Sequence, residues 1–164
     1  MSDGVESTTL SPLAQALGRV PSGLYVVASV HGERRLGFVG SFVMQQGFDP
    51  PILSVAVGKG RDHLKAIRAS GRFAVSVLDA VSSGLMGAFF RKHEGSGSAF
   101  DQVETGTTPG GVPFLAGALA WLECEVTGEH ETGDHVVVFG RVTAGEKLRE
   151  GEPSLHVRRN GLSY

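Results

Sequence analysis

Cysteine is almost missing from this sequence, which has Cys124 alone among its 164 residues. A single cysteine excludes an internal disulfide framework and any zinc site made of cysteine pairs. It fits a reducing compartment and equally a secreted protein without disulfides. Because the first ten residues are polar and acidic, unlike a signal peptide, we expect a cytoplasmic location.

Long apolar runs and basic runs are also lacking. No apolar run approaches the ~18 residues of a membrane-spanning helix, so we expect no membrane partner. Lys and Arg number 15 against 17 Asp and Glu, which gives a net charge of -2. Since the cations are not gathered into one run, nothing indicates a nucleic-acid-binding protein.

The familiar catalytic and metal-binding motifs are missing as well. The sequence contains no Walker phosphate loop, no HExxH, no CxxC and no GxSxG. Its histidines are not spaced as a ligand set, so we expect no metal. They are His31, His63, His93, His130, His135 and His156.

Glycine, in contrast, is abundant, at 24 of 164 residues, about twice the usual share of roughly 7%. Glycines spread among β-branched runs are typical of a β-rich domain with many tight turns. We expect a disordered tail over residues 1–10 and one domain over residues 11–164. It should hold about six or seven short strands and two or three short helices, in a closed or nearly closed barrel.

The order of the elements follows from apolar periodicity and turn residues. We predict strands over residues 24–30, 37–51, 52–58, 72–79, 119–131 and 135–148. We predict helices that begin at Ser11, at Asp62 as N-cap with Gly71 at C′, and at Val81. The segment 91–112 is a long loop, and such loops are usually functional or mobile.

The segment Gly37–Pro51 is too rich in small and polar residues to serve mainly as core. It carries Gly37, Gly40 and Ser41, then Gln45 and a neighbouring glutamine. Glycine inside a strand marks a bulge or the close approach of another backbone or a ligand. We therefore predict that a flat cofactor lies against this strand.

The segment Gly58–His63, GKGRDH, lies between a predicted strand and a predicted helix. Free N–H groups at a helix start, with Lys59 and Arg61 beside them, could bind an anion. An ordinary strand-to-helix turn with solvated cations explains the same residues. His135, directly after Gly133 and Asp134, is likewise either structural or placed at a barrel mouth.

Five motifs in the same order resemble those of the flavin reductase-like, FMN-binding split-barrel family, including its flavoredoxin and flavodiiron-protein branch. They cover about residues 13–164. The motifs are RVPSG (19–23), GFVGSFVMQQGFDPP (37–51), GKGRDHLKAIRASGRFAVSVLD (58–79), GDHVVVFGRV (133–142) and LHVRRNGLSY (155–164).

The resemblance implies a Greek-key split β-barrel that forms a homodimer, with the flavin near the dimer interface. It implies that one strand lines the isoalloxazine ring and ribityl chain, through Val39, Gly40, Ser41, Phe42, Val43, Met44 and Gln45. It implies that the next loop and helix hold the phosphate, through Gly58, Lys59, Gly60, Arg61 and His63. It also implies that His135 lies near the ring or the nicotinamide, as the catalytic residue, and that Phe100 approaches the flavin.

The function that the resemblance implies is NAD(P)H-dependent reduction of FMN, with FAD as the alternative flavin and a monooxygenase or another redox protein as partner. Hydride passes from the nicotinamide C4 to the flavin N5, a step that needs no acid–base residue. The alternative is an FMN-binding electron-transfer flavoprotein that does not react with a nicotinamide. Met44 and Asp62 depart from the family pattern and, with the flavoredoxin-like motif, keep this alternative open. A third hypothesis is an oxidase or another redox enzyme on the same barrel, since fold alone does not determine function.

Overall fold

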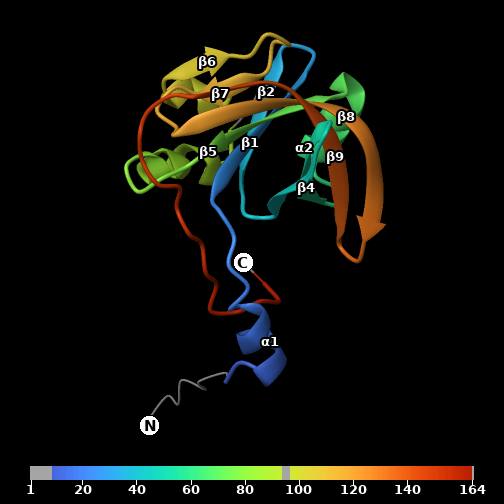
Figure 1. Cartoon of the computed structure of the whole chain (residues 1–164), viewed down its shortest axis with the longest axis vertical. Coiled ribbons are helices and arrows are strands. Elements are labelled where there is room, and N and C mark those ends of the chain that lie inside the picture. The colour runs from blue at the N-terminus through green and yellow to red at the C-terminus, as the bar shows by residue number, and fades with distance from the viewer. Residues whose placement is uncertain (1–8, 94–96, 164) are drawn as a thin grey trace.

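The chain forms one curved antiparallel sheet (Figure 1). The structure is a computed structural model that describes residues 9–93 and 97–163. Within these residues the sheet has seven strands, in the order β2-β1-β5-β8-β9-β4-β3. They are β1 (Tyr25–His31), β2 (Arg34–Gly40), β3 (Val43–Phe48), β4 (Pro51–Gly58), β5 (Arg72–Val77), β8 (Ala120–Thr132) and β9 (His135–Lys147). The architecture is the β-rich split barrel expected from the sequence.

The remaining elements are short and surround this sheet. A separate ribbon pairs β6 (Thr105–Thr107) with β7 (Pro113–Leu115). The helices are α1 (Pro12–Leu17), α2 (Asp62–Ser70) and the 3-10 helices η1 (Ser82–Phe90) and η2 (Ala99–Gln102).

The two edges of the sheet belong to consecutive strands. β2 and β3 are separated only by Ser41 and Phe42, so the sheet curls back on itself and nearly closes. The carbonyl of Phe42 accepts a hydrogen bond from the Ala56 N–H at 3.0 Å, which fixes this connection to β4.

The barrel interior is filled by apolar side chains from the strands and from α2. Phe73 and Val75 of β5 point into it and are 0% exposed, while Leu64 and Ile67 enter from α2. The opposite face of β5 is buried too, because Ala74 packs in a second cluster outside the barrel. Side chains therefore alternate between two apolar clusters along β5, and both faces of the strand are covered.

The second cluster is built by η1, η2 and the β6–β7 ribbon over the outer face of β1 and β5. Phe100 lies at its centre, 2% exposed, with its ring 5.0 Å from the ring of Phe89. The expectation that Phe100 approaches the flavin does not fit this placement, because its ring is enclosed by the chain's own side chains. The segment 91–112 likewise contains η2 and β6 and is not one irregular loop.

The predicted strand over residues 37–51 is in fact two strands. The chain leaves the ladder at Ser41 and Phe42, so β2 ends at Gly40 and β3 begins at Val43. Pro51 does not end a strand but opens β4. Proline is tolerated at the first position of a strand, where its missing N–H costs no ladder bond.

Two helix predictions also need correction. Arg61, not Asp62, is the N-cap of α2, and Asp62 is the first helical residue, where a carboxylate suits the helix dipole. The helix predicted from Val81 is the 3-10 helix η1, which contains Gly84 and another glycine three residues later, both poor α-helix formers. The C′ position of Gly71 is confirmed, with a φ of 67°.

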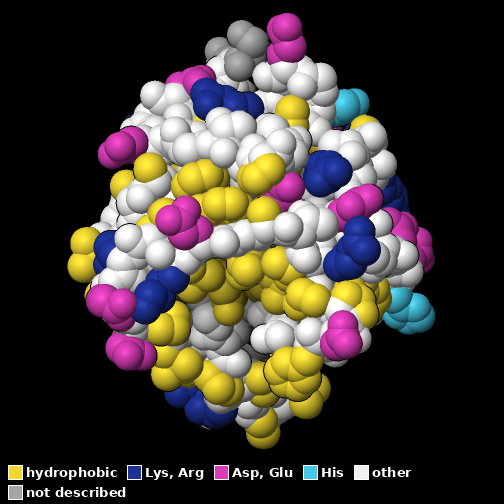
Figure 2. All heavy atoms as spheres, turned by 45° about the horizontal axis from the view of Figure 1, so that its top comes forward, with side chains coloured by type: hydrophobic (Ala, Val, Ile, Leu, Met, Phe, Trp, Pro, Cys, Tyr) yellow, Lys and Arg dark blue, Asp and Glu magenta, His cyan; other side chains and the backbone are white. Residues whose placement is uncertain are grey.

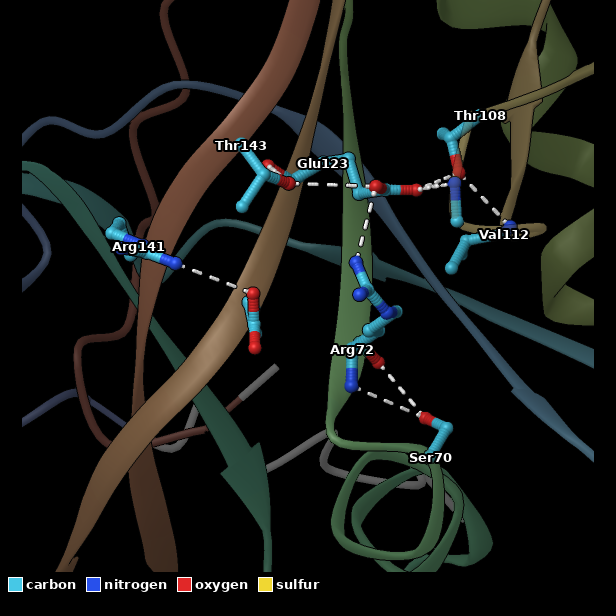
Figure 3. Close-up of polar contacts among 9 residues, drawn as sticks. Ser70, Arg72, Thr108, Val112, Glu123, Arg141 and Thr143 are labelled. Carbon is cyan, nitrogen blue, oxygen red and sulfur yellow. Dashed lines mark hydrogen bonds and ion pairs between the residues drawn. The ribbon is translucent and has the colours of Figure 1, made fainter.

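Glu123 of β8 is a charged residue that is only 2% exposed. Figure 3 shows its carboxylate between Arg72, Thr143 and the segment that carries Thr108. It accepts bonds from the Thr108 hydroxyl, from the Gly110 N–H at 2.9 Å and from Arg72 at 3.4 Å. This carboxylate ties the segment before β7 to the sheet.

We expect Glu123→Gln to destabilise the protein by about 1–3 kcal/mol, because the amide NH₂ would face a donor whichever way it turns, Thr108 and Gly110 on one side or Arg72 on the other, and would leave buried groups unpaired. Urea unfolding measures the change. The matched control is Glu125→Gln, whose exposed side chain pairs with Arg141 at 3.5 Å and should cost under about 0.5 kcal/mol. Equal effects of both variants would contradict this role of Glu123.

Candidate functional site

A cleft of about 670 Å³ lies where β2 leaves the barrel. This volume is in the range of about 300–1,000 Å³ that small-molecule sites occupy. Figure 2 shows one hollowed face of the molecule with hydrophobic side chains gathered around the hollow. The cleft is lined by Leu24, Phe38, Val39, Gly40, Ser41, Phe42, Ala56, Gly58, Arg61, Met86, Phe89, Phe90, His135, His156, Arg158, Arg159, Asn160 and Ser163.

The end of β2 and its connection to β3 form one wall. Gly40 still pairs with Tyr25 of β1, and the next two residues then leave the ladder. Ser41 is 4% exposed, and its hydroxyl oxygen is buried with no hydrogen-bond partner among the described residues. Because a buried polar group without a partner is costly, this hydroxyl indicates a bound group that completes it.

A second wall comes from β4 and β9, which pair so that Gly58 lies opposite His135. The ring of His135 meets the ring of Phe42 edge-on, with 5.8 Å between centroids. Its Nδ1 lies 2.7 Å from the Asp134 carboxylate, and this bond lowers the pKa of Asp134. The bond restrains the imidazole of His135, which lines the cleft.

A third wall is the C-terminal segment, residues 156–163. It is held by two bonds between Ser22 and His156, at 3.0 and 2.7 Å, and by the bond from the Arg19 guanidinium to the Arg158 carbonyl at 2.6 Å. The Arg158 guanidinium lies 4.6 Å from the centre of the Phe42 ring, a cation–π contact. The segment therefore closes the cleft over Phe42.

The 3-10 helix η1 supplies the last wall. Phe89 is partly buried against the second cluster, whereas Phe90 is 71% exposed. Of these two adjacent rings, only Phe89 packs into the protein, while Phe90 presents its ring at the surface; both line the cleft.

Seven of the residues assigned from the family resemblance line this cleft: Val39, Gly40, Ser41, Phe42, Gly58, Arg61 and His135. Six others lie outside its lining: Val43, Met44, Gln45, Lys59, Gly60 and His63. Met44 is 65% exposed on the edge strand β3, and Lys59 pairs with Glu131 at 3.2 Å. Binding roles for these residues stay predictions.

His63 lies in the first turn of α2 and outside the lining of the cleft. Its Nε2 lies 3.1 Å from the Gly37 carbonyl, and its ring packs edge-on against Phe38. Burial lowers its pKa, an effect that the bond to Gly37 opposes, with smaller contributions from neighbours such as Arg61. The ring is therefore mainly neutral at pH 7 and does not act as a fixed positive charge.

Sequence reasoning missed the residues that the C-terminal segment brings to the cleft. They are His156, Arg158, Arg159, Asn160 and Ser163. The motif LHVRRNGLSY was noted, but no residue in it was given a role. Two adjacent arginines followed by Asn-Gly were the available sign of a polar binding segment. Their place at the cleft follows only from the β-bridge between His156 and Ser22, which the sequence does not reveal.

The single cysteine lies in the barrel core. The Cys124 thiol is 0% exposed, and burial raises its pKa to about 12. Within residues 9–93 and 97–163, no three His, Cys, Asp or Glu side chains are grouped so that they could hold a metal ion. No helix in those residues is long and apolar enough to cross a membrane.

A buried ion pair joins two walls of the cleft. Asp79, 4% exposed after β5, accepts two bonds from Arg149 at 2.5 and 2.6 Å. The same carboxylate accepts bonds from the N–H and hydroxyl of Ser82, the first residue of η1. Asp79 also forms a β-bridge with Pro153, just before the C-terminal segment. This cluster thus sets where η1 and the C-terminal segment begin.

Comparison with known proteins identifies the domain type. Residues 17–161 match the family described as "Flavin reductase like domain". The chain is 35% identical over 156 residues to diflavin flavoprotein A 1 of Synechocystis sp., a match that covers 94% of this chain and 27% of that protein. The chain thus spans about a quarter of the length of the curated relatives it matches.

Solved structures with the same fold include two proteins at 29% identity. One is a nitrilotriacetate monooxygenase component B homologue from Mycobacterium thermoresistibile, with a TM-score of 0.80 over 90% of this chain and 81% of that one. The other is the Streptomyces globisporus NADH:FAD oxidoreductase SgcE6, with a TM-score of 0.81 over 91% of this chain and 92% of that one.

We expect Asp79→Asn to lower the thermal midpoint by several degrees at pH 7, because the Arg149 guanidinium then lacks its anion. Arg149 and the Ser82 donors hold the pKa of Asp79 well below its usual value of about 3.9. The carboxylate therefore stabilises the fold above about pH 4, and this contribution is lost as the pH falls through the folded-state pKa.

Thermal unfolding from pH 7 to pH 2.5 checks this expectation. The difference between wild type and Asp79→Asn should shrink below about pH 4. Glu150→Gln is the control, because the Glu150 side chain is 91% exposed and should change the midpoint little at any pH. A difference for Asp79→Asn that stays constant down to pH 2.5 would rule out the linkage.

Proposed function

The chain belongs to the flavin reductase like domain family, and from this premise we propose that it is an NAD(P)H-dependent flavin reductase that binds FMN in the cleft beside Phe42. The observation that carries the proposal is the buried Ser41 hydroxyl, which lacks a partner among the described residues and lies in a mainly apolar cleft. A flat ring with polar edge atoms fits such walls, since strand N–H groups and a short hydroxyl can bond those atoms.

The residues of the cleft have distinct proposed roles toward this flavin. Gly40 and Ser41 would contact the ring edge, and Phe42 would pack on it. Arg61 and the glycine-rich turn at Gly58 would hold the phosphate, since α2 begins directly after them. His135, fixed by Asp134, would lie near the ring and the nicotinamide. Val43, Met44, Gln45, Lys59, Gly60 and His63 keep the flavin-binding roles that the family resemblance implies.

Bound flavin would supply the acceptor for a hydride, which leaves the nicotinamide C4 with its electron pair and reaches the flavin N5. The chain's own work is to hold the two rings in contact and to keep water away from them. Phe42, Phe89 and Met86 provide apolar walls for this purpose. The absence of a catalytic triad from the sequence fits a reaction that needs no proton donor.

We propose a homodimer with the flavin near its interface. The edge strand β3 supports this, because it has a neighbour on one side only and exposes Met44 at 65% and Phe48 at 90%. A monooxygenase is the proposed partner, since solved relatives include a monooxygenase component B homologue and the flavin reductase of a styrene monooxygenase. A cytoplasmic location stays a prediction.

The second candidate is an FMN-binding electron-transfer module that does not react with nicotinamides. The similarity to diflavin flavoproteins favours it, because this chain corresponds to about a quarter of those proteins. In that case the cleft would bind FMN in the same way, and a protein donor would supply the electrons. The two candidates differ in the donor, not in the flavin site.

The proposal predicts that the purified protein oxidises NADH or NADPH faster with added FMN or FAD than the free flavin does. Stopped-flow absorbance without oxygen follows the bleaching of the flavin after each nucleotide is added. Bound flavin that only a protein donor reduces would replace the reductase with the electron-transfer module. No flavin binding at all would contradict both candidates.

Ser41→Ala tests the placement of the flavin. It should weaken FMN binding by about two- to tenfold, the value of one hydrogen bond, and leave the free protein at least as stable, because it removes an unpaired buried hydroxyl. Ser76→Ala is the matched control: its buried hydroxyl accepts a bond from the Leu115 N–H at 3.0 Å. That variant should lose stability and keep its FMN affinity. Fluorescence titration and thermal unfolding separate the two effects, and unchanged FMN affinity in Ser41→Ala would refute the placement.

A further inference from the structure

The carboxylate of Asp79 lies at a junction of three segments of the chain. β5 ends two residues before it, and η1 begins three residues after it. The third segment reaches it from the C-terminal side, where Pro153 forms a β-bridge with Asp79. Two backbone bonds tie the junction together, from the Ser154 N–H to the Leu78 carbonyl at 2.9 Å and from the Leu78 N–H to the Leu24 carbonyl at 3.0 Å. Because Leu24 lines the cleft, the junction is connected directly to its wall.

Asp79 holds two of these segments through its side chain. Its Oδ1 accepts bonds from the Ser82 N–H at 2.9 Å and from the Ser82 hydroxyl at 2.7 Å. The Arg149 guanidinium donates to Oδ1 at 2.6 Å and to Oδ2 at 2.5 Å, and it also donates to the Gly117 carbonyl at 3.3 Å. Since Asp79 is only 4% exposed, these bonds form at low local dielectric, where charge-assisted bonds are strong. One carboxylate therefore links the start of η1 to Arg149.

The 3-10 helix η1 carries the position of Ser82 to the cleft, because its last residues, Phe89 and Phe90, line that cleft. A 3-10 helix rises about 2 Å per residue, so the two ends of η1 lie about 16 Å apart. Its hydrogen-bond geometry is poorer than that of an α-helix, so η1 depends on contacts at its ends. These are the bonds to Asp79 at the start and the packing of Phe89 on Phe100 at the end, with 5.0 Å between ring centroids.

The C-terminal wall begins close to the same carboxylate. Two residues separate Pro153, which bridges to Asp79, from His156, where the wall starts. One of the two, Leu155, is 73% exposed and therefore contributes little to packing. This stretch takes its position from backbone bonds and from Arg149, which lies just before it in the sequence. One side-chain cluster is thus common to η1 and to the C-terminal wall.

We propose that Asp79, Ser82 and Arg149 are positioning residues for the flavin, which couple η1 to the C-terminal wall and hold both in place for binding. None of the three lines the cleft, so each acts through the walls and not by contact with the flavin. Walls that are already fixed cost the ligand no ordering when it binds, so loosening them weakens affinity. The inference rests on the proposed function, because it presupposes FMN in this cleft.

The test uses two variants that each release one wall, and their combination. Ser82→Ala removes the hydroxyl bond at the start of η1, and Arg149→Gln removes the guanidinium that joins Asp79 to the chain before the C-terminal wall. The matched control is Glu123→Gln, which also disturbs a buried carboxylate, but one whose partner Thr108 lies outside the cleft lining. Fluorescence titration gives Kd for FMN at a temperature where circular dichroism shows every variant to be folded.

We expect Kd for FMN to rise about three- to tenfold in Ser82→Ala and in Arg149→Gln, and to stay within about twofold in Glu123→Gln. In the double variant the rise should be smaller than the product of the two single effects, because both walls are held by one carboxylate. Since coupling is reciprocal, FMN should raise the thermal midpoint of the wild type more than that of either wall variant.

Several results overturn the inference, and they can be told apart. Wild-type Kd in both wall variants would show that the cluster does not position the cleft, and would leave the proposed function intact. An equal rise in Glu123→Gln would show that FMN affinity follows overall stability, and effects that multiply in the double variant would show that the walls are held independently. If wild type binds no FMN, the proposed function fails first, and the inference falls with it.

Discussion

The two-residue connection between the edge strands is the constraint on which the rest of the structure depends. β2 and β3 lie at opposite ends of the strand order, yet Ser41 and Phe42 alone separate them. The sheet must therefore curl until β2 and β3 come close together. Ser41 and Phe42, which connect them, pair with neither strand's hydrogen-bond ladder. The bond from the Ala56 N–H to the Phe42 carbonyl holds the crossing against β4, and the cleft forms beside it.

Rigid elements support this crossing from both sides. β1 and β5 are buried on their inner face by the barrel core and on their outer face by η1, η2 and the β6–β7 ribbon. Glu123 and Asp79 fasten the outer layer, the first by accepting bonds from Thr108 and Gly110, the second from Ser82 and Arg149. A site built on such elements keeps its geometry better than one built on loops.

Local chemistry made part of the fold predictable. Gly71 was placed correctly, and the break between the predicted strands 119–131 and 135–148 falls at the observed turn, because both depend on neighbouring residues only. The strand predicted over residues 72–79 was found as β5, since a strand is read from a period of two. Glu123 could not be placed, because its burial depends on Thr108, fifteen residues away in sequence. The C-terminal wall was missed for the same reason, since it exists only through the pairing of His156 with Ser22.

Gly37 shows how a correct local observation can have a different cause. The sequence indicated that something approaches this strand closely, and the structure agrees: a Cβ at Gly37 would lie 2.7 Å from the Phe89 ring and 2.8 Å from the Phe100 ring. The approaching groups are the chain's own aromatic side chains, which set the position of η1. Because η1 carries Phe89 and Phe90 to the cleft, the small residue at 37 acts on the site indirectly. Gly40 and Ser41, three and four residues later, line the cleft themselves. One run of small residues thus serves two purposes, packing at its start and ligand contact at its end, and sequence alone does not separate them.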